Sequence, residues 1–226
     1  TLKGYKVLLI DLDQQGSLSF ICKADATGKT TLGILTREIT AEEAIQPVEI
    51  ADIIPANKAL AGAEAVLKET GGEYRLKEAL EPIKGKYDFI IIDCPPALGS
   101  LTINALTAAD KVIVPAQADV LSLTGITQLY DSCKLVKKYT NKELEIAGIL
   151  LAKHSNRAVL KRDLEEVLRE QLSQQMQSKV YTATIREAVA INEAQYMQQS
   201  IFNYAGSSKV AEDYRAFIEE FLQDIK

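Results

Sequence analysis

The chain has 226 residues and a formal net charge of −5, so it is long enough for one sizeable core and offers no overall basic surface to nucleic acid. No run approaches the roughly 18 consecutive apolar residues that cross a bilayer, which excludes a membrane-spanning protein. Its three cysteines, Cys22, Cys94 and Cys133, are odd in number and widely spaced, which excludes a disulfide framework and a CxxC metal or redox motif. Because Thr1 to Lys6 lack a secretory signal, we expect a cytoplasmic protein. From its length we expect a single domain over 1–226.

Near-continuous aliphatic runs predict the strands of the fold. In chain order they are 6–13, a weaker run at 50–55, and then 87–93, 111–115 and 144–151. The first run and the run at 87–93 end in acidic residues. Their unbroken apolar character is typical of parallel strands that helices cover on both faces.

Helical stretches fill the gaps between these runs. The clearest is 123–139, where apolar residues recur at helical spacing behind Ser122, the predicted cap. Further helices are predicted at 74–83, 101–108, 159–175 and 210–225. Strands that alternate with helices of this length predict an α/β fold, a doubly wound and mostly parallel sheet flanked by helices, with its ligand site at the carboxyl ends of the strands.

Three aspartates stand where predicted strands end. Asp11 and Asp13 are two residues apart, so a strand that continued through both would place their carboxylates on one face, and Asp93 ends a second strand. Carboxylates gathered where phosphates bind can hold Mg²⁺ through its waters and orient an attacking water, as phosphoryl transfer requires. The alternative is that each aspartate only starts a turn or caps a helix.

Two motifs carry a family resemblance. DLDQQGS at 11–17 and DCPPALGSLTINAL at 93–106 resemble the ParA/Soj branch of the deviant-Walker P-loop ATPases. That branch usually reads DxDPQGN in the first motif, and in the second DxPP followed by a small-residue loop and a helix ending in NAL. The similarity continues through 108–129, 145–151 and 201–217, so it covers nearly the whole chain.

The resemblance implies a role for each aspartate. Asp13 would position the hydrolytic water, Asp11 would support the magnesium shell, and Asp93 would be the Walker B carboxylate, with ATP and Mg²⁺ as cofactors. Gln14 stands where the family usually has proline, which is a departure at the turn between the first two aspartates and the helix that follows.

The same resemblance implies a nucleotide switch. The loop 95–100 would sense the γ-phosphate, and its glycine would allow the backbone to move there. The residues implied in switching and nucleotide sensing are Gln15, Gly16, Pro95, Pro96 and Gly99.

The phosphate-binding loop of the family has no counterpart within the sequence. In the family a KGGxGK[ST] loop and the first strand precede the stretch that corresponds to 6–13, so we expect both before Thr1. The 226 residues alone are therefore expected to be inactive.

The segment TGKTT at 27–31 contains half of the Walker pattern, but the leading glycine of that pattern would fall on Lys23. We therefore predict a surface loop in which Thr30 or Thr31 caps the helix that follows, and we exclude Lys29 from the site.

Clusters of basic residues are the candidates for DNA contacts. One cluster lies on a face of the helix at 123–139 and just beyond it: Lys134, Lys137, Lys138 and Lys142. The other consists of Lys153, Arg157, Lys161 and Arg162. Such clusters are either phosphate contacts or ordinary solvated surface, and a dimer would double the patch.

The C-terminal third departs from the family at basic positions. IREAVAINEA at 185–194 falls where relatives often read IPRNVRLSEA, so Glu187 and Ala190 replace arginines. Ser207 replaces one basic residue of the family's PRSRG stretch. The predicted survivors of the DNA-contacting surface are Arg186 and Lys209.

The leading hypothesis from the resemblance is an ATP-dependent DNA-segregation ATPase, cytoplasmic and associated with the nucleoid. ATP would drive a homodimer that binds double-stranded DNA nonspecifically, and a ParB-like centromere-binding partner would stimulate slow hydrolysis. The alternatives are a MinD-like membrane positioner, a dethiobiotin-synthase-like ligase, a nitrogenase-reductase-like iron–sulfur carrier and a nucleotide-free scaffold. The acidic polar face of the last helix disfavours the membrane positioner. His154 is the only histidine, so no Ser-His or Cys-His nucleophilic site can form.

Overall fold

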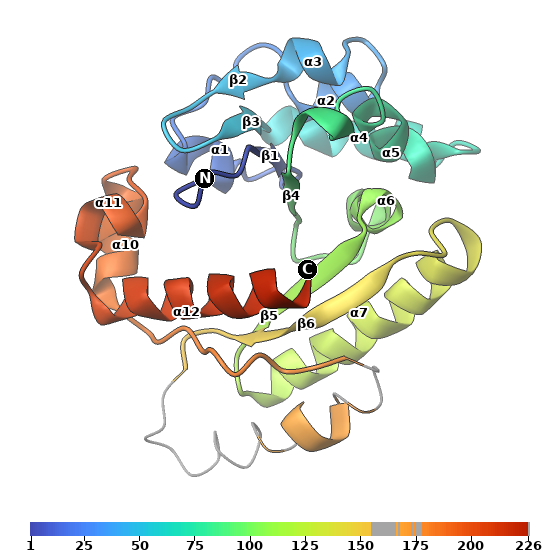
Figure 1. Cartoon of the computed structure of the whole chain (residues 1–226). Coiled ribbons are helices and arrows are strands. Elements are labelled where there is room, and N and C mark those ends of the chain that lie inside the picture. Colours follow the sequence, from blue (N-terminus) through green and yellow to red (C-terminus); the bar gives the residue numbers. More distant parts are fainter. Residues whose placement is uncertain (155–165, 167, 173, 175–177, 226) are drawn as a thin grey trace. The chain divides into compact units, whose positions relative to one another are not determined.

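The computed structural model describes residues 1–154, 166, 168–172, 174 and 178–225 (Figure 1). The chain forms two compact units. Unit 1 is Thr1–Ala109 with Val136–Lys142, and unit 2 is Asp110–Leu135 with Glu143–Lys226. The single domain over 1–226 stays a prediction.

Unit 1 contains a four-stranded sheet with the strand order β2-β3-β1-β4. The strands are β1 (Val7–Asp11), β2 (Gln46–Pro47), β3 (Asp52–Ile54) and β4 (Phe89–Asp93). β1 lies parallel to both β3 and β4, whereas β2 pairs antiparallel with β3. The parallel core of the predicted sheet is therefore confirmed. The two-residue β2 was not predicted, because so short a strand has no periodicity to detect.

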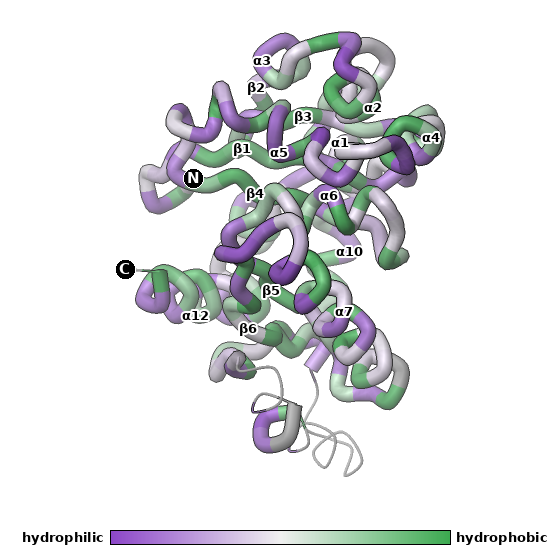
Figure 2. The backbone as a smooth tube through the Cα atoms, turned by 90° about the vertical axis from the view of Figure 1, so that its right-hand side faces the viewer, coloured by the Kyte–Doolittle hydropathy of each residue, from purple (hydrophilic) through white to green (hydrophobic). Residues whose placement is uncertain are grey.

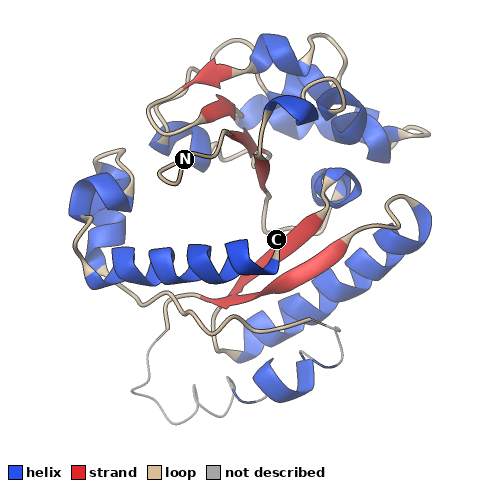
Figure 3. Ribbon diagram, in the orientation of Figure 1, coloured by secondary structure: helices blue, strands red, loops and turns tan. Residues whose placement is uncertain are grey.

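The helices of unit 1 are short (Figure 3). They are α1 (Ser17–Ile21), α2 (Thr31–Leu35), α3 (Ala41–Ala44), α4 (Ala63–Leu67), α5 (Arg75–Leu80) and α6 (Ser100–Ala108). Turns of 3-10 helix occur at Lys58–Gly62, Gly72–Tyr74 and Lys84–Lys86. The predicted helices at 74–83 and 101–108 correspond to α5 and α6, and the helix predicted after 27–31 corresponds to α2. The others are too short to show a sequence period.

One face of β1 builds the core of unit 1. Leu8, Ile10 and Leu12 are fully buried against apolar residues of α2, α4, α5 and α6. Figure 2 shows β1 as a predominantly hydrophobic stretch of the backbone. On β4, Ile90 and Ile92 join this core, whereas Ile91 points to the opposite face and stays 52% exposed. The face of β4 that carries Ile91 is therefore less covered than the face that carries Ile90 and Ile92.

Unit 2 is built on two parallel strands, β5 (Lys111–Ala116) and β6 (Glu145–Leu151). Its helices are α7 (Val120–Tyr139), whose last residues belong to unit 1, and α10 (Val189–Tyr196), α11 (Ile201–Ala205) and α12 (Lys209–Asp224). Most of the helix predicted at 159–175 lies outside the described residues, and Leu168–Leu172 form a π-helical turn.

The start of α7 corrects one prediction. The helix begins at Val120, and the carboxylate of Asp119 accepts hydrogen bonds from the Ser122 amide at 2.8 Å and from its hydroxyl at 3.2 Å. Asp119, not Ser122, therefore satisfies the first turn, since a carboxylate at this position also complements the helix dipole.

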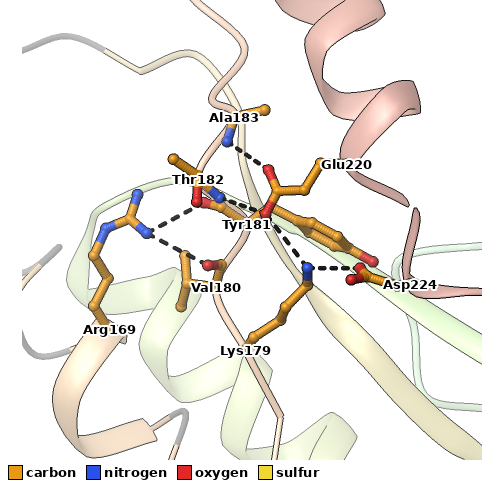
Figure 4. Close-up of polar contacts among 8 residues, drawn as sticks. All are labelled: Arg169, Lys179, Val180, Tyr181, Thr182, Ala183, Glu220 and Asp224. Carbon is orange, nitrogen blue, oxygen red and sulfur yellow. Dashed lines mark hydrogen bonds and ion pairs between the residues drawn. The ribbon is translucent and has the colours of Figure 1, made fainter. Parts of the chain in front are cut away.

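The last helix packs on the core of unit 2, as its apolar stripe predicts. Val210, Tyr214, Phe217 and Phe221 of α12 join a buried cluster with Leu150, Tyr181 and Ile185. On its acidic polar face, Asp213, Glu220 and Asp224 bind a neighbouring segment. Figure 4 shows the carboxylate of Glu220 accepting hydrogen bonds from the amides of Thr182 and Ala183, at 3.0 and 2.9 Å.

The segment 178–185 is fixed from two sides. The Lys179 ammonium lies 3.3 Å from the Glu220 carboxylate and 2.6 Å from that of Asp224 (Figure 4). On the other side, the Tyr181 amide donates to the Ile149 carbonyl at 2.9 Å, so the segment runs along β6. Part of the acidic face of α12 is therefore used inside the protein. In the described part of the chain, no helix is long and apolar enough to cross a membrane.

Tyr181 generates a prediction for stability. Its ring is fully buried edge-on against Phe217, and Gly148 leaves room for it, because a Cβ there would lie 2.6 Å from the ring. Within the described residues the Tyr181 hydroxyl has no hydrogen-bond partner, and burial, aided by Asp224 and Glu220, raises the pKa of Tyr181 to about 12.

Tyr181→Phe should therefore leave the free energy of unfolding unchanged or raise it by about 1 kcal/mol, since a buried unsatisfied hydroxyl is costly. Gly148→Ala is the contrasting variant and should cost roughly 1–3 kcal/mol through overpacking against the same ring. Urea unfolding monitored by circular dichroism measures both. A loss of more than about 1 kcal/mol in Tyr181→Phe would show that the hydroxyl has an ordered partner.

Candidate functional site

The strand-end aspartates lie together in unit 1. Asp11 and Asp93 are direct partners in the parallel register of β1 and β4, and the Leu12 amide donates to the Asp93 carbonyl at 2.9 Å. Asp13 follows two residues after Asp11, outside the strand. The expected gathering of the three residues at the carboxyl ends of adjacent strands is what the structure shows, although β1 ends before Asp13.

Asp13 shapes the turn that follows β1, which we call the acidic turn (Asp11–Gly16). Its side-chain Oδ1 accepts from the Gln15 amide at 3.0 Å, and its carbonyl accepts from the Gly16 amide at 2.9 Å. The first bond closes an Asx turn, and the second closes a backbone turn over Gln14 and Gln15. The turn forms with Gln14 at the position where the family usually has proline, because the aspartate side chain supplies the bond that fixes it.

Gly16 is required by both conformation and space. Its φ of +64° lies in the left-handed region, and a Cβ at this position would lie 2.9 Å from the Ala56 carbonyl oxygen. Gly16 thereby brings the start of α1 close to the loop that follows β3. Its implied part in nucleotide sensing stays a prediction.

Asp11 is fully buried, and its carboxylate is already hydrogen-bonded. Oδ1 accepts from the Asp13 amide at 3.1 Å, and Oδ2 accepts from the Ser19 amide at 2.9 Å and from the Ser19 hydroxyl at 2.6 Å. Ser19 was not predicted as a site residue, since a lone serine eight positions after an aspartate gives no sequence signal. The hydrogen bonds show that Asp11 caps the start of α1, and its part in the magnesium shell stays a prediction.

Asp93 is electrostatically strained by its surroundings. Its pKa is raised by partial burial first and then by the negative charges of Asp11 and Asp13. A cation bound here would relieve that repulsion, and carboxylate oxygens are the ligands that Mg²⁺ prefers. Among the described residues, no three His, Cys, Asp or Glu side chains lie close enough to hold an ion directly. The magnesium roles of Asp11 and Asp93 therefore stay predictions.

The loop after β4 contains the other predicted switch residues. Pro95 is half-buried and Pro96 exposed, and Gly99 precedes the first residue of α6. Gly99 has extended backbone angles, and a Cβ there would meet only the Glu64 carboxylate at 3.8 Å. Neither its conformation nor its surroundings requires glycine, so a hinge role stays a prediction.

The glycine-lysine segment at 27–31 serves a structural purpose. Lys29 lies at the surface, 3.8 Å from the Glu43 carboxylate. The predicted side-chain cap was wrong, because Thr30 occupies the cap position of α2 without making a cap bond. The Thr31 hydroxyl instead lies 2.7 Å from the Asp11 carbonyl and 3.1 Å from the Pro55 carbonyl.

The predicted DNA-contacting residues lie in unit 2. The Arg186 guanidinium forms a bidentate pair with Asp213, with Nε and Nη2 at 2.6 and 2.7 Å from its oxygens, and the Arg186 amide binds the same carboxylate at 3.1 Å. This pair lowers the pKa of Asp213. Lys209 is the exposed first residue of α12. In the second basic cluster, Arg157, Lys161 and Arg162 lie outside the described residues.

The three departures at basic positions are all accessible to solvent. Glu187 and Ser207 are exposed and Ala190, on α10, is half-buried. In the cluster on α7, Lys134 lies 3.6 Å from Asp131 and over the ring of Tyr130. Whether any of these residues contacts DNA stays a prediction.

The parallel sheet and its strand-end carboxylates define an α/β protein. The AAA domain family model matches residues 1–146 and places the chain among the P-loop NTPases. Soj, the sporulation initiation inhibitor protein of Bacillus subtilis, is 40% identical over 96% of this chain and 86% of its own. The chromosome partitioning protein ParA of Myxococcus xanthus is 34% identical over 96% of this chain and 77% of its own.

A solved structure shares the fold. Cobyrinic acid a,c-diamide synthase from Mycobacterium smegmatis with bound ADP and magnesium is 32% identical, with a TM-score of 0.75 over 92% of this chain and 86% of that chain. Nucleotide and magnesium therefore occur together in a related structure. The chain belongs to the ParA/Soj family of partitioning ATPases.

The raised pKa of Asp93 predicts a pH dependence of stability. A carboxyl group whose pKa is higher in the folded state stabilises the fold when protonated, and this contribution is lost as the pH rises through the folded pKa. Asp93→Asn removes the ionisable group, and with it the loss of stability at higher pH. It should raise the free energy of unfolding at pH 7 by less than about 1 kcal/mol, because solvent screens an exposed group.

The difference between Asp93→Asn and the unaltered protein should shrink as the pH falls toward the ordinary aspartate value of about 3.9. Urea unfolding between pH 4.5 and pH 7.5, without nucleotide or magnesium, measures it. Asp131→Asn on the surface of α7 is the control and should give no such gain. A variant that is less stable than the unaltered protein at pH 7 would show that the Asp93 charge is compensated.

Proposed function

We propose that the protein is an ATP-dependent DNA-partition ATPase that hydrolyses ATP slowly with magnesium. The observation that carries the proposal is the placement of Asp11, Asp13 and Asp93 at the carboxyl ends of two adjacent parallel strands, in a chain 40% identical to Soj. Ligands of open α/β sheets bind at that edge.

We assign different tasks to two of the three carboxylates. Asp93 would hold the water shell of magnesium, because its charge is the one that its neighbours make unfavourable. Asp13 would position the attacking water, because it is only half-buried within the acidic turn and anchored through a single side-chain oxygen to the Gln15 amide. When bound, magnesium neutralises phosphate charge and orients the phosphates for attack.

The wider cycle follows the family. ATP binding drives a homodimer that binds double-stranded DNA nonspecifically, and a ParB-like partner stimulates hydrolysis and release. The protein then works in the cytoplasm on the nucleoid. The cargo, whether chromosome or plasmid, is set by the partner.

A second candidate rests on the diamide synthase similarity. An enzyme of that kind would spend ATP on amide formation, so a corrinoid acid substrate would stimulate ATP hydrolysis. Partition is the favoured function, because 40% identity to Soj over 96% of this chain is the stronger similarity. ATP-dependent DNA binding, without stimulation of ATP hydrolysis by a corrinoid acid, is the result expected for it.

Asp13 tests the ATPase mechanism. In the encoded full-length protein, Asp13→Asn should lower kcat for ATP by roughly a hundredfold or more, because positioning and proton acceptance by a carboxylate are lost. ATP-induced retardation of duplex DNA should persist, whereas ADP should give none. Unchanged turnover would remove Asp13 from the reaction, and equal retardation with ATP and ADP would contradict a nucleotide switch.

Variants of Lys209 and Arg186 distinguish a residue that contacts DNA from one that forms a structural ion pair. Lys209→Ala should weaken nonspecific DNA binding and reduce its salt dependence by about one released counterion, since one phosphate contact is lost. Arg186→Ala should mainly lower stability, because it leaves Asp213 without its bidentate partner. Fluorescence anisotropy at several salt concentrations measures binding, with Lys58→Ala as a surface control. A larger binding loss in Arg186→Ala than in Lys209→Ala would reverse the assignment.

A further inference from the structure

The Asp11 carboxylate belongs to a buried chain of hydrogen bonds that reaches beyond the acidic turn. The Ser19 hydroxyl donates to Asp11 Oδ2 at 2.6 Å and accepts from the Ala56 amide at 2.9 Å. Asp11 is 0%, Ser19 2% and Ala56 1% exposed. These hydrogen bonds therefore connect the end of β1, the helix α1 and the loop after β3 without contact with solvent.

The backbone of Asp11 extends the same connection. Its carbonyl accepts from the Thr31 hydroxyl, and the Thr31 amide donates to the Pro55 carbonyl at 2.8 Å. Two hydrogen-bonded paths thus lead from Asp11 to the loop at 55–56, one through Ser19 and one through Thr31. Residues that lie far apart in the sequence are held in a fixed arrangement at a single aspartate.

We infer that Asp11 is a positioning residue that acts through Ser19 and does not itself reach the magnesium shell. Its Oδ1 fixes the Asp13 amide, and its Oδ2 fixes Ser19 and, through the serine hydroxyl, the loop at Ala56. The inference rests on the proposed function, since the residue that Asp11 positions is the one assigned to the attacking water.

The physical basis is the cost of a buried charge. A carboxylate away from water is tolerated only when donors compensate it, and here three donors do so. Turning the Asp11 side chain toward an ion would break these bonds and would leave the Ser19 hydroxyl and amide unsatisfied in a buried place. Asp93, which is exposed and repelled by its neighbours, can meet a hydrated ion without such losses.

Ser19 and Ser17 provide a matched pair for the test. Both are serines of α1, but Ser17 is exposed whereas Ser19 is buried against Asp11. Ser19→Ala removes one donor to Asp11 and the acceptor of the Ala56 amide. Ser17→Ala changes neither, and Ser19→Thr keeps the hydroxyl.

The first measurement needs no ligand. Hydrogen exchange of the backbone amides in the nucleotide-free protein should show that Ser19→Ala lowers the protection of the Asp13 and Ala56 amides at least tenfold. Ser17→Ala should leave both unchanged, and Ser19→Thr should restore them. Unchanged protection in Ser19→Ala would overturn the positioning role, whether or not the protein hydrolyses ATP.

The second measurement compares kcat with the magnesium requirement in the full-length protein. Ser19→Ala and Asp11→Asn should both lower kcat, by roughly tenfold to a hundredfold as expected for a misplaced catalytic group, and should leave the magnesium concentration for half-maximal rate unchanged. If Asp11→Asn raises that concentration severalfold while Ser19→Ala does not alter kcat, Asp11 is part of the magnesium shell and the inference is wrong. Absence of ATPase activity in the unaltered protein would contradict the proposed function instead, and the exchange result would still stand.

Discussion

The hydrogen bonds to the buried Asp11 carboxylate hold the end of β1, the first turn of α1 and the loop after β3 in one arrangement. A negative charge in this place is compatible with folding only while those donors stay in position, so the charge imposes their geometry. Gly16 makes the arrangement possible, because any side chain there would collide with the Ala56 carbonyl. The bond from the Asp13 amide to Asp11 also fixes the position of the half-buried Asp13.

Charge is balanced differently in the two units. In unit 1 the pKa of Asp93 is raised by burial first and then by the negative charges of Asp11 and Asp13. In unit 2 three acids of α12 are paired: Asp213 with Arg186, and Glu220 and Asp224 with Lys179. A carboxyl group whose pKa is raised by burial and by neighbouring acids is typical of a functional site.

Much of the fold could be predicted from the sequence, because long aliphatic runs such as 87–93 and the stripe of α12 have clear periods. The strand-end positions of Asp11 and Asp93 could be predicted for the same reason, whereas Asp13 was predicted inside a strand that ends at Asp11. What the sequence could not show depends on contacts between distant segments. The bond from Ser19 to Ala56, the use of Thr31 at the Asp11 carbonyl and the Arg186–Asp213 pair have no local pattern. The start of α7 was misplaced because Asp119 and Ser122 are both plausible caps, and only the hydrogen bonds distinguish them.

The account is tested most directly by a crystal structure of the encoded full-length protein with magnesium and a nonhydrolysable ATP analogue. It predicts that Asp93 contacts a water of the magnesium shell, that Asp13 faces the γ-phosphate, and that Asp11 keeps its hydrogen bonds to Ser19. A magnesium ion bound at Asp11, with the Ser19 bonds broken, would contradict the account, as would a nucleotide bound away from the carboxyl ends of β1 and β4.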